Sequence, residues 1–242
     1  MRIWITGAST GIGAATVREL ARRGHTLFLT ARSVDKLAEL PGEAKPGDVT
    51  DREAMHRIAA EIAPLDVALL GAGTYVPVDP RELDADVFRR HLDVNVMGAV
   101  HCIEAVLPGM LEQRSGRLAV VASVTGYAAL PRAAAYGATK AFLISMCDSL
   151  RADLAGTGVE VTTVNPGFVR TPLTDQNEFD MPFLIEADKA AREIADGLEA
   201  GKPEIAFPLP MAIAMKTLGS LPGALSRRYS ARLSKRLRAS EK

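Results

Sequence analysis

Cysteine is scarce in this chain of 242 residues, which excludes a fold held together by disulfides. The two cysteines, Cys102 and Cys147, both fall in apolar, helix-like patterns. We therefore expect two small buried side chains in a reducing compartment. The four histidines show no metal-ligand spacing, so no metal site is predicted.

Neither sign of charge is in excess. Lysine and arginine together number 29, as do aspartate and glutamate, so the formal net charge is +0 at pH 7. This balance does not predict nucleic acid as a partner. No apolar run reaches the ~18 residues of a membrane span. The first predicted strand begins at Arg2 and leaves no room for a signal peptide, so we expect a cytoplasmic protein.

The sequence does contain a regular alternation of strands and helices. Predicted strands cover 2–6, 26–30, 66–70, 116–123, 159–165 and 204–207. Predicted helices cover 14–24, 33–40, 51–62, about 86–112, about 133–155 and 189–201. The third helix has a capping-box spacing, with Thr50 three residues before Glu53.

This order predicts the fold class. Near-continuously apolar strands that alternate with helices indicate a parallel sheet covered on both faces. We predict an α/β protein with a single doubly wound Rossmann-fold domain and a sheet of about seven strands. That domain covers 1–207, and an apolar and then basic helical extension is predicted over 208–242.

A glycine-rich turn, "TGASTGIG" (6–13), joins the first strand to the first helix. Gly7 allows a sharp turn, and Gly11 and Gly13 allow backbone to approach a ligand. The N–H groups at the start of the helix would face an anion. The turn therefore predicts a site for the pyrophosphate of a dinucleotide.

Tyr136 and Lys140 stand four residues apart in "AAYGATKAF" (134–142). On a helix they lie on one face, one turn apart. An ammonium beside a phenol lowers the pKa of the phenol, which would give a proton donor or acceptor that works near neutral pH. Taken alone, the pair is also consistent with a tyrosine that covers the core and a lysine that reaches solvent.

Together, G-x-x-x-G-x-G and Y-x-x-x-K resemble the short-chain dehydrogenase/reductase family, in particular its NADP(H)-preferring members. Further family segments follow in order: "GDVTD" (47–51), "NVMG" (95–98), "VASVTG" (121–126) and "NPGFVRT" (165–171). The sequence departs from the family at 70–73, where "LGAG" replaces N-N-A-G. Leu70 and Gly71 replace the two asparagines, so we expect different hydrogen bonding there.

The resemblance implies a carbonyl–alcohol oxidoreductase with a catalytic tetrad. Ser123 would orient the substrate oxygen and Tyr136 would transfer the proton. Lys140 would lower the pKa of Tyr136 and hold the nicotinamide ribose, and Asn95 would hold a water that links Lys140 to solvent. The implied cofactor-binding residues are Gly7, Ser9, Thr10, Gly11, Ile12, Gly13, Arg32, Asp48, Val49, Ala72, Gly73, Asn95, Tyr136, Lys140, Pro166, Gly167, Val169 and Thr171.

The end of the second strand predicts which cofactor binds. An acidic residue there would favour NAD, but the chain has Ala31 followed by Arg32. A guanidinium matches a 2′-phosphate with paired donors, and Ser9 and Thr10 could add hydroxyl donors. NADP(H) is therefore the predicted cofactor; the alternative is that Arg32 is a solvated surface charge.

The substrate is predicted from the segment 172–188, which is expected to close the pocket. With Ser123, its apolar residues suggest a neutral, hydrophobic ketone, aldehyde or secondary alcohol. The predicted pocket residues are Ser123, Phe168, Phe179, Met181 and Phe183. Alternatively, these aromatic and methionine side chains only pack the lid onto the core.

Two alternatives to this enzyme remain open. One is a catalytically silent nucleotide-binding regulator or scaffold on the same fold. The other is a nucleotide-sugar epimerase or dehydratase, although such chains are usually longer.

Two further expectations concern partners. The family forms homodimers and homotetramers, often through helices that correspond to about 86–112 and 133–155. The basic end 224–242 could lie on a membrane surface, or the extension could instead cover the substrate entrance or a subunit interface.

Overall fold

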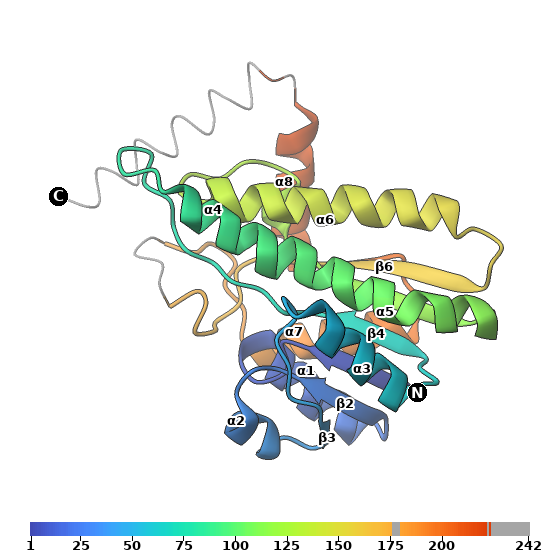
Figure 1. Ribbon diagram of the computed structural model, residues 1–242. Helices are drawn as coiled ribbons and strands as arrows, with labels where there is room; N and C mark the ends of the chain where they lie inside the picture. The colour runs from blue at the N-terminus through green and yellow to red at the C-terminus, as the bar shows by residue number, and fades with distance from the viewer. Residues whose placement is uncertain (176–179, 222, 224–242) are drawn as a thin grey trace.

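The computed structural model describes residues 1–175, 180–221 and 223. Its centre is a seven-stranded sheet in the order β3-β2-β1-β4-β5-β6-β7 (Figure 1). The strands are β1 Arg2–Thr6, β2 Thr26–Thr30, β3 Glu43–Ala44, β4 Val67–Leu70, β5 Gly116–Val121, β6 Val159–Pro166 and β7 Glu204–Phe207. Every neighbouring pair is parallel, which confirms the predicted doubly wound α/β fold.

Helices connect these strands. They are α1 Gly11–Arg22, α2 Val34–Ala38, α3 Arg52–Ile62, α4 Ala85–His91, α5 Gly98–Gln113, α6 Ala134–Asp153, α7 Ala187–Glu199 and α8 Leu209–Ser220. A π-helix, η1 (Leu92–Met97), joins α4 to α5, and a 3-10 helix, η2 (Val124–Gly126), follows β5.

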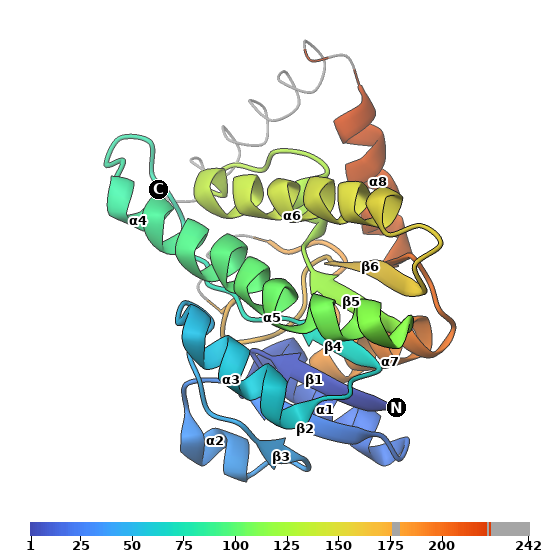
Figure 2. The same cartoon turned by 45° about the vertical axis from the view of Figure 1, so that its right-hand side comes forward.

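The sheet separates two apolar cores. Successive strand residues point to opposite faces, so Trp4 joins the core shared with α3, α5 and α6, whereas Ile3 and Ile5 join the core shared with α1 and α7. Figures 1 and 2 show these two groups of helices on either side of the sheet. The strand order reverses between β1 and β4, and in such sheets ligands bind where the carboxyl ends diverge.

The predicted helix over 86–112 is interrupted by the π-helix η1. The whole segment Ala85–Gln113 is, by length and composition, the one helix among the described residues that could cross a membrane. Its inner face packs on the sheet, because Cys102, Val106 and Met110 belong to the core.

The predicted capping box at α3 is wrong. The N-cap is Asp51, whose side chain accepts a hydrogen bond from the Ala54 N–H at 2.9 Å. The Thr50 hydroxyl donates instead to the Asp48 carboxylate at 2.9 Å, and Thr50 lies one residue before the N-cap.

Strand β3 was not predicted, whereas helix α8 falls within the helical extension predicted for 208–242. Helix α8 packs on β7 and on the turn around η2, with Met211 and Met215 buried against Val124. The predicted basic segment 224–242 lies outside the described residues.

Candidate active site

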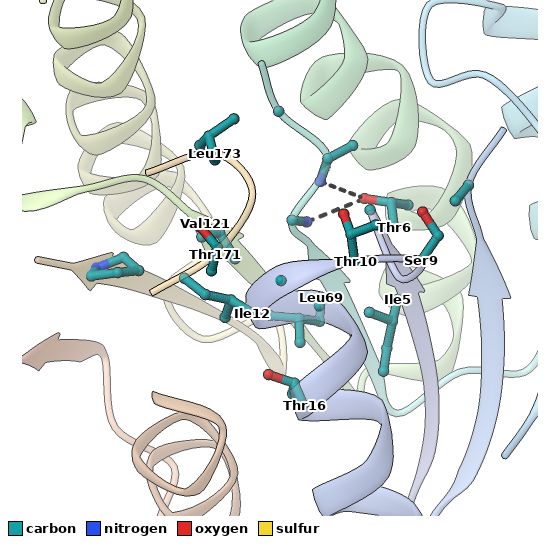
Figure 3. A pocket seen from close by; sticks show the side chains of 18 of the residues that line it. Ile5, Thr6, Ser9, Thr10, Ile12, Thr16, Leu69, Val121, Thr171 and Leu173 are labelled. Carbon is teal, nitrogen blue, oxygen red and sulfur yellow. Dashed lines mark hydrogen bonds between the residues drawn. The ribbon is translucent and has the colours of Figure 1, made fainter. Parts of the chain in front are cut away.

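One long cleft runs along the carboxyl ends of the central strands. Ser9 and Thr10 lie in the turn above α1, with Thr171 and Leu173 on the opposite wall (Figure 3). All the predicted cofactor-binding residues line this cleft except Asn95. Ser123 lines it as well, so the structure brings the glycine turn and three predicted catalytic residues together.

The glycine turn is packed too tightly for side chains. A Cβ on Gly13 would lie 2.1 Å from the carbonyl oxygen of Gly7. Gly7 has φ +70, and its Cβ would lie 2.7 Å from the amide nitrogen of Ala72. Thr10, the N-cap of α1, makes no side-chain capping hydrogen bond, and the first turn of α1 has no acidic residue. The helix therefore presents its positive end to the cleft.

Thr6 contacts the LGAG segment at 70–73. Leu70 is buried in the core. The Thr6 hydroxyl accepts hydrogen bonds from the N–H groups of Gly71 at 3.2 Å and Ala72 at 3.4 Å, the dashed lines in Figure 3. These two hydrogen bonds connect the end of β1 to the loop after β4.

Ser123 follows β5 and is held by backbone on two sides. Its hydroxyl donates to the Pro166 carbonyl at 3.3 Å and accepts from the Thr125 N–H at 3.2 Å. Both contacts are long for hydrogen bonds that involve a hydroxyl. These two weak hydrogen bonds therefore orient the Ser123 hydroxyl and can be exchanged for a hydrogen bond to a ligand.

Tyr136 and Lys140 lie on one face of α6, as the spacing predicts. The Lys140 Nζ is 5.4 Å from the centroid of the Tyr136 ring. It also donates a hydrogen bond to the Val121 carbonyl at 2.8 Å. Lys140 is 4% exposed, so its ammonium is held inside the cleft wall.

The pKa of Tyr136 differs from the prediction. Burial raises it to about 12, although the Ser123 side chain opposes this shift. Burial also lowers the pKa of Lys140 to about 8. Desolvation penalises the charged form of each group, and this outweighs the lowering of the Tyr136 pKa expected from Lys140.

Asn95 lies in η1, behind the cleft wall. Its amide oxygen accepts from the Thr74 N–H at 2.7 Å, and its amide nitrogen donates to the Thr74 carbonyl at 3.0 Å and to the Thr139 hydroxyl at 3.1 Å. Asn95 therefore ties the loop after β4 to α6. Its role in holding a water stays a prediction.

Tyr75 is a candidate that the sequence reasoning missed. Its ring meets the Tyr136 ring edge to face, with centroids 5.2 Å apart and an interplanar angle of 74°. Burial raises the pKa of Tyr75, and Arg132 opposes that shift. The available signal was position, because a residue just beyond the carboxyl end of β4 is expected to reach the crevice.

The predicted substrate pocket is only partly assembled. Phe168 packs into the apolar cluster with Val124 and Met211 instead of lining the cleft. Phe183 is 55% exposed. Met181 does not line the cleft, and Phe179 lies outside the described residues. In the described part of the segment after Thr171, the apolar residues that line the cleft are Pro172 and Leu173, and Figure 3 labels Leu173.

Comparison with known proteins gives a consistent result. Residues 2–181 match the family described as short chain dehydrogenase. An uncharacterized oxidoreductase of Myxococcus xanthus (strain DK1622) is 37% identical over 234 residues, which cover 91% of this chain and 92% of that protein.

Solved structures with the same fold include several that contain a nicotinamide cofactor. A short-chain dehydrogenase from Sphingobium yanoikuyae in complex with NADPH has a TM-score of 0.79 and 26% identity, covering 92% of this chain and 97% of that one. The closed form of a serine dehydrogenase complexed with NADP+ has a TM-score of 0.78 and 25% identity, covering 86% and 94%. The sequence match extends over most of the chain, and the protein is an oxidoreductase that belongs to the short-chain dehydrogenase family.

Proposed function

We propose that the protein is an NADP(H)-dependent oxidoreductase that interconverts a carbonyl and an alcohol, with Tyr136 as proton donor and acceptor. The observation that carries this proposal is the shared cleft. Ser123, Tyr136 and Lys140 line it together with the glycine turn and Arg32. Proton transfer and dinucleotide binding can therefore occur in one site.

The residues of the cleft fit a dinucleotide phosphate. The tight glycine turn and the positive end of α1 suit a pyrophosphate. Ala31 and Arg32 line the cleft after β2, and neither is acidic, which suits an adenosine 2′-phosphate. The related structures with NADPH and NADP+ support the same cofactor.

The side chains divide the chemistry among them. Tyr136 gives a proton to the substrate oxygen during reduction and takes it back during oxidation. Ser123 donates a hydrogen bond to the same oxygen. The Lys140 ammonium stabilises the Tyr136 phenolate that remains after proton transfer. When bound, the nicotinamide supplies or accepts the hydride.

A neutral, hydrophobic carbonyl compound is the substrate class that we propose. The Tyr75 ring beside Tyr136 and Leu173 in the cleft wall offer apolar surface near the reacting groups. Apolar pockets with a few polar groups select such ligands.

The test is NADPH oxidation by the pure protein with aldehydes, ketones, quinones and steroid-like or fatty carbonyls. Tyr136→Phe should lower kcat by about 10²–10⁴-fold, the usual contribution of a general acid. NADPH affinity should change by less than about threefold, because the glycine turn and Arg32 are intact. Near-full turnover by Tyr136→Phe would contradict the mechanism. Absence of turnover by the unmodified protein with every carbonyl would favour the nucleotide-binding regulator.

A further inference from the structure

A cluster of four polar side chains lies beside the turn that follows Ser123. Its members come from different parts of the fold: Tyr127 after η2, Asn165 in β6, Glu204 in β7 and Lys216 in α8. None of the four lines the described cleft, so neither dinucleotide binding nor proton transfer explains them. We call this set the Glu204 cluster.

The Glu204 carboxylate accepts hydrogen bonds from all three partners. The Tyr127 hydroxyl donates to Oε1 at 2.5 Å, and the Asn165 amide donates to the same oxygen at 3.2 Å. Lys216 donates to Oε2, and its Nζ also lies 5.1 Å from the centroid of the Tyr127 ring. One carboxylate thus joins a turn, two strands and a helix.

The charges in the cluster fit this arrangement. Burial alone would raise the pKa of Glu204, but the hydrogen bonds from Lys216, Tyr127 and Asn165 lower it overall. Burial and the neighbouring Glu204 raise the pKa of Tyr127, which keeps its hydroxyl protonated as a donor. The Lys216 side chain is 46% exposed and that of Glu204 is 36% exposed, so the ion pair adds little stability. Its main effect is on geometry.

The same cluster touches both segments that hold Ser123. Tyr127 lies four residues after Ser123, and the turn between them is closed by the Gly126 N–H, which donates to the Ser123 carbonyl at 2.9 Å. Asn165 precedes Pro166, whose carbonyl accepts from the Ser123 hydroxyl at 3.3 Å. The segment 123–127, which carries Ser123, and the segment 165–166, which orients the Ser123 hydroxyl, are therefore both hydrogen-bonded to Glu204.

Helix α8 packs tightly onto these two segments. A Cβ on Gly219 would lie 2.1 Å from the Tyr127 carbonyl oxygen, and one on Gly167 would lie 2.6 Å from the Met211 sulfur. Met211 and Met215 also share an apolar cluster with Val124, the residue after Ser123. A shift of α8 would therefore move the surroundings of Ser123.

We propose that the Glu204 cluster is a positioning device that fastens α8 to the turn 123–127 and thereby fixes the Ser123 hydroxyl relative to Tyr136. Glu204 and Lys216 are positioning residues that act through Ser123. This inference rests on the role of Ser123 in the proposed function.

The first test is Glu204→Gln. Glutamine has no negative charge and offers one acceptor oxygen instead of two, so it cannot accept from Lys216 and from the Tyr127–Asn165 pair at the same time. One side of the cluster is therefore weakened. Turnover of the best carbonyl substrate should fall by about tenfold to a hundredfold, the effect of a displacement of ~1 Å in a catalytic geometry. NADPH affinity should stay within about twofold, because the dinucleotide part of the cleft is separate.

The matched control is Glu160→Gln. Glu160 lies in β6 and pairs with Arg117 in β5, away from the Glu204 cluster, and it does not line the cleft. This variant should keep the turnover of the unmodified protein. Equal turnover in Glu204→Gln and Glu160→Gln would overturn the proposal.

Lys216 separates positioning from simple stabilisation. Because its side chain is half exposed, Lys216→Met should leave the thermal unfolding temperature nearly unchanged while it lowers kcat, and Lys216→Arg should restore kcat. Full turnover in folded Lys216→Met would contradict the proposal, and this variant decides the matter if Glu204→Gln does not fold.

Hydrogen exchange supplies a readout that needs no substrate. In Lys216→Met, amides of 124–127 and of α8 should exchange faster together, whereas a change confined to α8 would overturn the coupling. Tyr136→Phe is measured in parallel. If Tyr136→Phe is inactive and Glu204→Gln turns over at the full rate, only the positioning role fails; if Tyr136→Phe is active, the proposed function fails.

Discussion

Burial controls the proton chemistry of two residues one helical turn apart. The pKa of Lys140 is lowered to about 8, whereas that of Tyr136 is raised to about 12. The shifts have opposite signs because the lysine is charged when protonated and the tyrosine when deprotonated. Below a pH of about 8 the site therefore carries an ammonium beside a neutral phenol.

This order of pKa values predicts a pH profile. The kcat/KM for carbonyl reduction should fall as pH rises through about 8, because the Lys140 ammonium is lost. Lys140→Arg keeps its charge to pH values above about 12, so its residual activity should not show this fall. Initial rates in buffers of constant ionic strength measure both profiles. A fall near pH 8 that persists in Lys140→Arg would assign it to another group.

A second prediction concerns the single residue Arg32 and the choice between NADPH and NADH. Arg32→Ala should raise the KM for NADPH by roughly 10- to 100-fold, since charge-assisted hydrogen bonds contribute about 1.5–3 kcal/mol. The KM for NADH should change much less. Lys36→Ala is a matched control, because Lys36 is also exposed but does not line the cleft. An equal rise for both cofactors would show that Arg32 does not read the 2′-phosphate.

Motif spacing locates Ser123, Tyr136 and Lys140, but it cannot locate Tyr75. Tyr75 meets Tyr136 because two distant loops are joined, with the Val78 N–H donating to the Arg132 carbonyl at 2.8 Å. No local pattern encodes such a contact. The same limit applies to Phe168, which the sequence directs to the substrate and the structure places beneath α8.

The N-terminus of α3 is capped by the side chain of Asp51. Asp51→Ala should lower the free energy of unfolding by about 0.5–2 kcal/mol, because it removes the side-chain acceptor of the Ala54 N–H. Thr50→Ala should have a smaller effect, since Thr50 does not cap α3. Urea unfolding of both variants compares them directly, and a larger loss for Thr50→Ala would contradict the assignment of the cap.

Among the elements, the strongly periodic ones are predicted and the short or irregular ones are not. The strands β1, β2 and β4 to β7 can be predicted because each is a run of mostly apolar residues. Strand β3 has two residues, too few for any period. The π-helix η1 has the composition of the helix around it, so its extra backbone residue leaves no signal in the hydrophobic pattern.

The formal net charge of the whole chain is +0, yet the segment 224–242 holds seven basic residues and one acidic residue. Arg227, Arg228, Lys235 and Arg238 follow α8 in the sequence, outside the described residues. Full-length protein should sediment with anionic vesicles at low salt and stay in the supernatant with neutral ones, because each basic residue near an anionic surface contributes about 1 kcal/mol. Changing these four residues to glutamine should abolish sedimentation. Equal sedimentation with both vesicles would contradict the electrostatic contact.

The sheet ends on one side in β3, with two residues, and on the other in β7, with four residues packed against α8. Edge strands are where one chain can extend another by backbone pairing, the first step of amyloid-like aggregation. These two edges offer few unpaired backbone groups, and one is partly shielded by a helix. Because both edge strands are short and α8 packs against β7, association by the addition of a strand from another chain is disfavoured.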